Sequence, residues 1–160
     1  MRICGCHGSA GLELTAWSAP GSDGQRQVRG LKFMDSLILT LLPYRYGVYR
    51  LDSVSSPEYP TDPGGGFFSV TRTAEEISVV CREELLPVGC TPEKGFRVFK
   101  VEGPLAFSLT GILAALLSPL AAAGVAVFTI STYDTDYLLV KAEKLKEAIS
   151  ALNAVATINC

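Results

Sequence analysis

The stretch GPLAFSLTGILAALLSPLAAAGVAVFTISTY, which covers residues 103–133, contains no charged residue. Such a stretch is either a membrane span, which needs about 20 continuous apolar helical residues, or two buried elements. Pro119 removes an amide donor inside the run, and Gly124 follows LAAA, where a helix C-terminal glycine is expected. No cluster of Lys or Arg flanks the stretch to set a membrane topology. The sequence therefore predicts two elements divided near Gly124, with a membrane span as the alternative.

The two elements differ in kind. Residues 109–123 predict a helix, whereas the β-branched and aromatic residues after Gly124 predict a buried strand over 126–132. Elsewhere, apolar alternation predicts strands and apolar residues at helical spacing predict helices. The remaining strands are expected at residues 36–42, 46–51, 67–71, 76–81, 95–103 and 135–143, and the remaining helices at residues 82–87 and 141–153.

The order of these elements predicts an α+β fold, in which antiparallel sheets carry helices on one face. The second half of the chain is expected to form strand, helix, strand, strand, helix. The first half repeats this order weakly, with a loop in place of the first helix. FFSVTRTAEEISVVCREELL (67–86) also aligns by eye with FTISTYDTDYLLVKAEKL (128–145), which indicates an internal duplication.

Composition excludes some classes of function. The net charge of −2 and the absence of a basic run argue against nucleic-acid binding, which needs clustered Lys and Arg. The chain has five cysteines, an odd number, without a Cys-x-x-Cys pair, which favours a reducing, cytoplasmic location. CGCH (residues 4–7) lacks a second pair of ligands, so no metal or other cofactor is expected.

The N-terminal residues differ from the rest of the chain. Residues 1–33 hold scattered glycine and polar residues without a sustained period, and they lack the apolar core of a secretory signal. We expect them to form a disordered leader. Regular structure is predicted to begin directly after Met34, so a start codon at Met34 is an alternative.

Two segments carry a resemblance to a known family. GGGFFSVTRTAEEISVVC (64–81) and the run from 101 to 140 resemble the two-lobed ACT-domain proteins. The most specific part is ISTYDTDYLLV (130–140), because of its strand-turn-strand pattern and its distance from LTGILA (109–114). These small bacterial-type proteins are similar to the cytosolic sensors called CASTOR and to the regulatory domains of aspartate kinases. The resemblance covers residues 37–152.

The resemblance implies two tandem ferredoxin-like ACT domains, each ideally βαββαβ. The N-terminal domain would cover residues 34–94 and the C-terminal domain residues 95–155. The first domain is degenerate, since the Pro- and Gly-rich loop at 52–66 replaces its first helix. Proteins of this kind bind a free amino acid at an interface between ACT units and carry no active site of their own. A homodimer or a regulated partner protein is implied as well.

The residues themselves offer a place for the carboxylate of an amino acid. The leading N–H groups of a helix lack intrahelical partners, and the helix dipole favours an anion there. The predicted helix opens with SLTGIL, so the backbone amides of Thr110, Gly111 and Ile112 are candidate carboxylate ligands. An ordinary N-cap by Ser108 or Thr110 is the alternative.

The ammonium group needs acceptors, and the turn STYDTDY (131–137) supplies them. Asp134 and Asp136 follow a buried strand, and Ser131 and Thr132 add hydroxyl groups. The resemblance favours Asp136 as the ligand contact, with Thr132, Tyr133 and Thr135 beside it, whereas Asp134 also suits a turn. An acidic turn favours a basic amino acid such as arginine or lysine, but the α-ammonium of any amino acid satisfies it equally.

Catalysis has little support in the sequence. The single histidine is His7, so the predicted folded part cannot assemble a Ser-His-Asp or Cys-His set. PGGGFF (63–68) lacks the Lys of a phosphate-binding loop. We therefore expect a sensor of amino acids and no enzyme, with a ligand-free interaction module as the second hypothesis.

Overall fold

The structure, a computed structural model, describes residues 37–52, 62, 64–87 and 91–159 of the chain. The strands are β1 (Ile38–Leu41), β2 (Tyr46–Asp52), β3 (Ser69–Arg72), β4 (Glu76–Arg82), β5 (Glu93–Val101), β6 (Val127–Ser131), β7 (Asp136–Lys141) and β8 (Thr157–Asn159). The helices are α1 (Ile112–Ala122) and α2 (Leu145–Leu152), and the 3-10 turns are η2 (Glu83–Leu85) and η3 (Ala142–Lys144). These elements confirm the predicted α+β fold class.

Strand β5 is the centre of the sheet because it pairs along both of its edges. One edge pairs antiparallel with β7, from Phe96 opposite Lys141 to Lys100 opposite Tyr137. The other edge pairs with β1 at its C-terminal end and with β2 at its N-terminal end. Between them, the N–H of Leu42 donates to the Val98 carbonyl at 2.9 Å. The chain from β1 to β2 therefore follows one edge of β5 from end to end.

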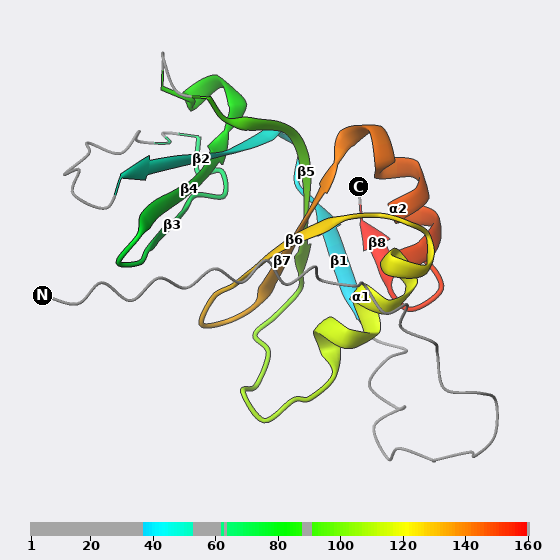
Figure 1. Ribbon diagram of the computed structural model, residues 1–160. Coiled ribbons are helices and arrows are strands. Elements are labelled where there is room, and N and C mark those ends of the chain that lie inside the picture. The colour runs from blue at the N-terminus through cyan, green and yellow to red at the C-terminus, as the bar shows by residue number, and fades with distance from the viewer. Residues whose placement is uncertain (1–36, 53–61, 63, 88–90, 160) are drawn as a thin grey trace, which may run out of the picture.

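The second half of the chain has the ferredoxin-like order β5-α1-β6-β7-α2-β8, which is βαββαβ. Its last strand, β8, does not pair with β5 directly, because β1 lies between them and is parallel to β8 and antiparallel to β5. Strands β2, β4 and β3 continue the sheet away from the helices (Figure 1). The two halves of the chain therefore share one sheet of eight strands.

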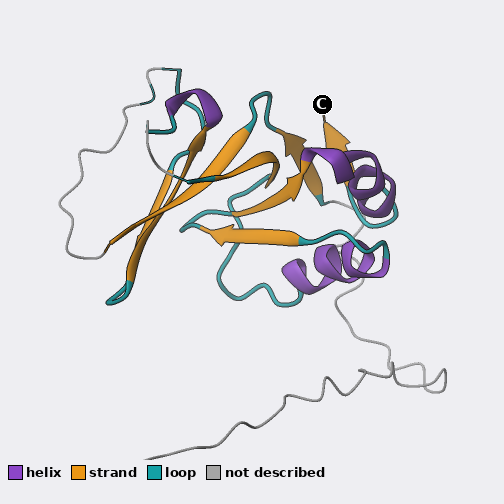
Figure 2. Ribbon diagram, turned by 45° about the horizontal axis from the view of Figure 1, so that its top comes forward, coloured by secondary structure: helices purple, strands orange, loops and turns teal. Residues whose placement is uncertain are grey.

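Both α-helices cover the same face of the sheet, as Figure 2 shows. Leu116 and Leu120 of α1 and Leu152 of α2 are fully buried against the sheet. Phe99 and Val101 of β5 meet them, as their alternation in the sequence predicts. Full burial of each such side chain contributes about 1.5–3 kcal/mol. This layer is the main core of the protein.

Strands β2, β3 and β4 form the β2–β4 arm of the sheet, and a second core lies between this arm and the opposite face of β5. Val98 and Leu139 are fully buried there with Tyr46 of β2. Phe67 closes this cluster, since its ring stacks on Tyr137 with centroids 4.1 Å apart, and its N–H donates to the Tyr46 hydroxyl at 3.4 Å. The segment before β3 is thereby held against the central strands.

A largely buried ion pair secures the same segment. Arg82 Nη2 lies 2.6 Å from Asp62 Oδ1, and their side chains are 12% and 5% exposed. Asp62 also accepts hydrogen bonds from the N–H groups of Gly64 and Gly66, while the Arg82 guanidinium lies 4.6 Å from the centroid of the Tyr44 ring. Removing one partner of such a pair leaves a buried charge uncompensated. Most of the predicted loop at 52–66 lies outside the described residues.

The predicted break near Gly124 is confirmed. Helix α1 ends at Ala122, Gly124 takes the left-handed conformation with φ of 66°, and β6 begins at Val127. The helix starts at Ile112 and not at the predicted residue 109, because Gly111, with φ of 83°, is its N-cap. No helix of the described residues has the length and hydropathy needed to cross a bilayer.

Other boundaries differ from the predictions in smaller ways. The predicted helix at 82–87 is the single 3-10 turn η2, and the predicted helix at 141–153 is divided into η3 and α2. Strand β8 was not predicted. The described part of the first half holds four strands and one 3-10 turn, and its assignment as a degenerate ACT domain stays a prediction. The predicted leader at 1–33 lies outside the described residues.

Gly124→Ala should destabilise the protein by about 1–2 kcal/mol, because an alanine in the left-handed region brings its Cβ too close to the backbone. Apart from Gly124 itself and its two neighbours in the chain, no residue has an atom within 4 Å of a Cβ built at this position, so the loss reports local backbone conformation. Gly124→Asn is the matched control, since Asn tolerates this region better. Urea unfolding measures both variants, and an equal loss in both would contradict the argument.

Stability should also fall above about pH 10. Burial raises the pKa of Tyr46 above its ordinary value of 10.0. The contribution of Tyr46 to the free energy of unfolding is fully present below the pKa that this tyrosine has in the unfolded chain. The contribution is lost as the pH rises through the pKa of Tyr46 in the folded protein. Urea unfolding between pH 8 and pH 11 should therefore show a steeper decline for the wild type than for Tyr46→Phe. Tyr133→Phe, which alters a largely exposed ring, should follow the wild type.

Candidate functional site

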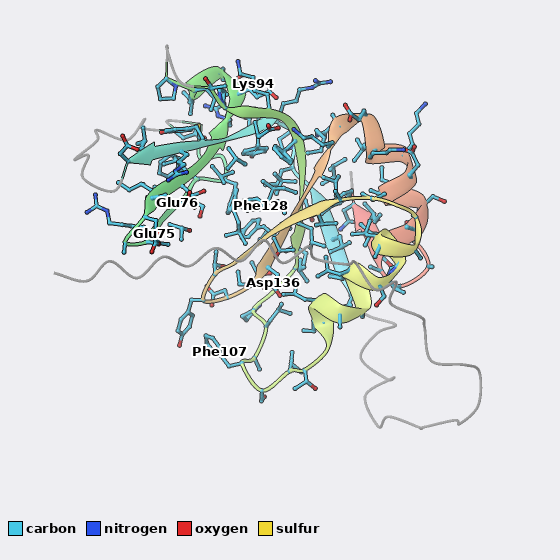
Figure 3. The ribbon with its side chains drawn as sticks, viewed as in Figure 1. Glu75, Glu76, Lys94, Phe107, Phe128 and Asp136 are labelled. Carbon is cyan, nitrogen blue, oxygen red and sulfur yellow. The ribbon has the colours of Figure 1, made fainter. Side chains whose placement is uncertain are left out.

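A cleft of about 290 Å³ lies where the β5–α1 loop, the start of α1 and the β6–β7 turn meet. The loop follows the end of β5 and the turn precedes the start of β7, which pairs antiparallel with β5. The lining residues are Leu105, Ala106, Phe107, Leu109, Gly111, Ile112, Leu113, Ser131, Thr132, Tyr133, Asp134, Thr135 and Asp136. Figure 3 shows Asp136 at the start of β7 and Phe107 on the loop before α1.

The start of α1 brings unsatisfied backbone donors to the cleft. Gly111 is the N-cap, and its carbonyl accepts from the N–H of Ala115 at 2.9 Å. No side chain caps the helix, so the predicted alternative of an N-cap by Ser108 or Thr110 is wrong. The N–H groups at the N-cap and in the first turn have no intrahelical partner. Gly111, Ile112 and Leu113 line the cleft, so this end of α1 presents a positive pole to it.

The β6–β7 turn brings oxygen atoms to the opposite wall. Ser131 Oγ donates to Asp136 Oδ1 at 2.5 Å, across the last pair of the hairpin. Thr132 and Thr135 close the turn, since the Thr132 N–H donates to the Thr135 carbonyl at 2.8 Å. The Thr132 hydroxyl donates to the same carbonyl at 2.9 Å. One carboxylate oxygen of Asp136 is therefore held in place by the hairpin itself.

Thr135 attaches the turn to the centre of the sheet. Its side chain is buried, and its hydroxyl donates to the carbonyl of Val101, the last residue of β5. The next segment of chain is attached to the same turn, because the N–H of Leu105 donates to the Asp134 carbonyl at 2.8 Å. The two walls of the cleft are thus joined by hydrogen bonds at its base, which fixes their separation.

The structure brings seven of the eight predicted site residues to one cleft. Those that line it are Gly111, Ile112, Ser131, Thr132, Tyr133, Thr135 and Asp136. Thr110 is exposed and does not line the cleft, since it precedes the N-cap and lies outside the first turn of the helix. Whether the seven residues bind a ligand stays a prediction.

Sequence reasoning missed the loop residues of the cleft. Leu105, Ala106, Phe107 and Leu109 lie in a segment without helical or strand periodicity, so no pattern assigned them to a surface. The one available signal was Phe107, a large aromatic residue in a loop. The metal candidate at 4–7 lies outside the described residues. Within the described part, no group of three His, Cys, Asp or Glu side chains could hold a metal ion.

Comparisons with known proteins agree with the fold. Residues 91–154, which include most of the βαββαβ unit, match the family model of the ACT domain, and residues 44–88 match a model of an N-terminal domain. The crystal structure of protein Atu0741 from Agobacterium tumefaciens is 37% identical, with a TM-score of 0.71. The match covers 78% of this chain and 92% of that one. The chain belongs to the same family as Atu0741 and carries an ACT domain.

More distant structures share the fold of this ACT-domain protein. VC0802 from Vibrio cholerae is 21% identical with a TM-score of 0.63, and the match covers 79% of this chain and 98% of that one. Aspartate kinase from Clostridium acetobutylicum, an allosteric enzyme, is 10% identical with a TM-score of 0.55 over 74% of this chain and 33% of the enzyme. No curated protein matches the chain. The relation to the CASTOR sensors and the tandem arrangement of two ACT domains stay predictions.

Thr135→Val should test the anchor at the base of the cleft. The substitution keeps the shape of the side chain but removes the hydroxyl that donates to the Val101 carbonyl. We expect a loss of about 1 kcal/mol in the free energy of unfolding. Thr129→Val is the control, because Thr129 is a half-buried threonine of the neighbouring strand β6 that does not line the cleft. Equal midpoints for the two variants in urea would show that the anchor contributes nothing.

Proposed function

We propose that this ACT-domain protein is a regulatory sensor that binds a free amino acid in the cleft between α1 and the β6–β7 turn. The observation that carries the proposal is the pairing of an uncapped helix N-terminus with a fixed carboxylate across one small cleft. The cleft volume of about 290 Å³ lies at the lower limit of small-molecule sites, which suits an amino acid better than a nucleotide. The ACT-domain match supports the regulatory role.

The two ends of the cleft suit the two charges that every free amino acid carries. The amides of Gly111, Ile112 and Leu113 would bind the α-carboxylate, because they lack intrahelical partners and lie at the positive end of the helix dipole. The carboxylate of Asp136 would accept the α-ammonium, with Ser131 and Thr132 beside it. An α-amino acid is thus bound by its common part, and its side chain is left to the rest of the cleft.

Regulation requires that the ligand change an equilibrium between two states. We propose that the cleft is completed by a second ACT unit, in a homodimer or in a regulated partner, so that the ligand binds at the interface. The ligand then shifts assembly by its difference in affinity for the two states and by no more. The proposal includes a cytoplasmic location and no catalytic role, which follow from the cysteine and histidine content of the sequence.

A ligand-free interaction module is the second candidate. It is favoured by the edges of the described sheet, since β3 pairs only with β4, β6 only with β7, and β8 only with β1. An unpaired strand edge is a ready surface for another chain. Sedimentation velocity with and without the twenty amino acids distinguishes the candidates. Self-association that no amino acid alters would favour this module over the sensor.

Binding of at least one amino acid should raise the melting temperature of the protein at millimolar concentration, and Asp136→Asn should weaken that binding at least about tenfold. A hydrogen bond to a charged group contributes about 1.5–3 kcal/mol, which corresponds to a factor of ten or more in Kd. Thermal shift identifies the ligand, and calorimetric titration measures its Kd.

Asp52→Asn is the control for this measurement. Asp52 is an exposed carboxylate at the end of β2, in the arm that does not contribute to the cleft. The Asp52→Asn variant should bind the amino acid with the Kd of the wild type. Urea unfolding without ligand should show whether the Asp136→Asn variant remains folded. A folded Asp136→Asn variant with wild-type affinity would refute the assigned role of Asp136.

A further inference from the structure

Two end strands of the described sheet line the same groove. From β3 to β6 the strands pair in the order β3-β4-β2-β5-β7-β6, and each strand is antiparallel to the next. Among the described strands, β3 pairs only with β4, and β6 pairs only with β7. Both β3 and β6 nevertheless line one groove of about 350 Å³. This part of the sheet is therefore a curled layer that stays open along the gap between β3 and β6.

The outward backbone groups of β6 lie at this gap. In an antiparallel hairpin, pairs of residues that exchange hydrogen bonds alternate with pairs that do not. The N–H of Thr132 donates to the Thr135 carbonyl at 2.8 Å, so the hairpin begins with a bonded pair. The alternation then leaves Ser131 and Thr129 in non-bonded pairs with β7. Their N–H and C=O groups point away from β7, and both residues line the groove.

Strand β6 has none of the features that usually protect an edge strand from pairing. Such strands are commonly guarded by charged side chains, prolines or bulges. The sequence of β6, VFTIS, contains no charged residue and no proline, and its register with β7 is continuous. Phe128 of β6 lines the groove and is 40% exposed. By contrast, β3 ends with the charged residue Arg72. The free edge of β6 is therefore suited to the addition of another strand.

The walls of the groove determine which side chains it could accept. Hydroxyl and apolar side chains share these walls, namely those of Ser69, Thr71, Ser78, Phe128 and Ile130. Glu76 is the one charged residue among the nine lining residues, all of them described, and its carboxylate lies 3.2 Å from Arg50 Nε. Figure 3 shows Glu76 on the β2–β4 arm and Phe128 on β6. A charged side chain that entered the groove would lose water without gaining an unpaired counterion.

We propose that this gap receives an extended segment of a partner protein, which adds to the edge of β6 as an antiparallel strand. The backbone of the segment bonds to the outward groups of Thr129 and Ser131. Its alternate side chains enter the groove over Phe128 and Ile130, and these side chains are uncharged and β-branched, as those of Val and Thr are. The inference names a macromolecular partner and does not depend on a ligand in the cleft.

A designed peptide tests the site directly. The capped peptide KTVTVTK places two valines opposite Phe128 and Ile130, and its three threonines then direct their N–H groups at β6, because the two sets alternate along a strand. Titration into the ¹⁵N-labelled full chain should shift the amide resonances of Thr129, Ser131 and Ser78 in two-dimensional NMR spectra. The shifts should saturate with a Kd of about 1 mM or lower.

Two methylated peptides are the matched ligands. N-methylation of the three threonines removes the donors that face β6 and should weaken binding at least about tenfold. N-methylation of the two valines leaves those donors intact and should change the Kd less than about threefold. The side chains of both peptides are those of the parent, so the comparison isolates the backbone bonds.

Variants of the protein assign the site. Thr129→Pro removes an outward N–H that is not bonded to β7, and proline is tolerated on an edge strand when its nitrogen faces outward. This variant should bind the parent peptide at least about tenfold more weakly. Ser78→Tyr should have a similar effect, because the ring fills the groove. Ser118→Tyr, at an exposed position of α1 outside the groove, is the control and should bind as the wild type does. Urea unfolding verifies that each variant is folded.

The outcomes distinguish this inference from the sensor proposal. If the peptide leaves the amides of Thr129 and Ser131 unshifted at about 5 mM, or binds a folded Thr129→Pro variant as well as the wild type, the strand site is refuted. If the full chain dimerises in sedimentation velocity and Thr129→Pro makes it monomeric, a second copy covers β6 and the partner segment is refuted. None of these results depends on whether an amino acid binds in the cleft.

Discussion

The whole structure depends on β5 being covered on both edges and both faces. Its nine residues pair with β7 on one edge and with β1 and β2 on the other. One face lies under α1 and α2 through Phe99 and Val101, and the other lies under the β2–β4 arm through Val98. Because β1 also lies between β5 and β8, the ferredoxin-like unit is incomplete without a strand from the first half. We infer that the two halves cannot fold as independent units.

This requirement explains which parts of the fold were predictable. The alternation of apolar residues and the positions of turn-forming residues located β5, the Gly124 break and the β6–β7 hairpin. Each of these features is decided by residues close together in the chain. The insertion of β1 between β5 and β8 is a pairing across more than a hundred residues, which local patterns do not encode. Strand β8 itself has only three residues, too few for a period to be recognised.

The candidate site was predictable to a similar extent and for similar reasons. The helix tip and the acidic turn each have a local chemical signature, and their meeting in one cleft follows from the βαββαβ order. The error at Thr110 came from placing the helix start without the geometry of Gly111. The loop with Phe107 was missed because its position depends on contacts with the turn, such as the Leu105 to Asp134 hydrogen bond.

The β6–β7 hairpin is the element through which a ligand and a partner could influence one another. Its turn supplies Asp136 to the cleft, and its outer strand, β6, has an edge that no described strand covers. Ser131 belongs to both surfaces, since it also lines a groove of about 350 Å³ between β6 and the β3–β4 hairpin. The Ser131–Asp136 hydrogen bond joins the two sides, because Ser131 Oγ donates to Asp136 Oδ1. Under the sensor proposal, this bond would connect occupancy of the cleft to the end of β6, where another strand would pair.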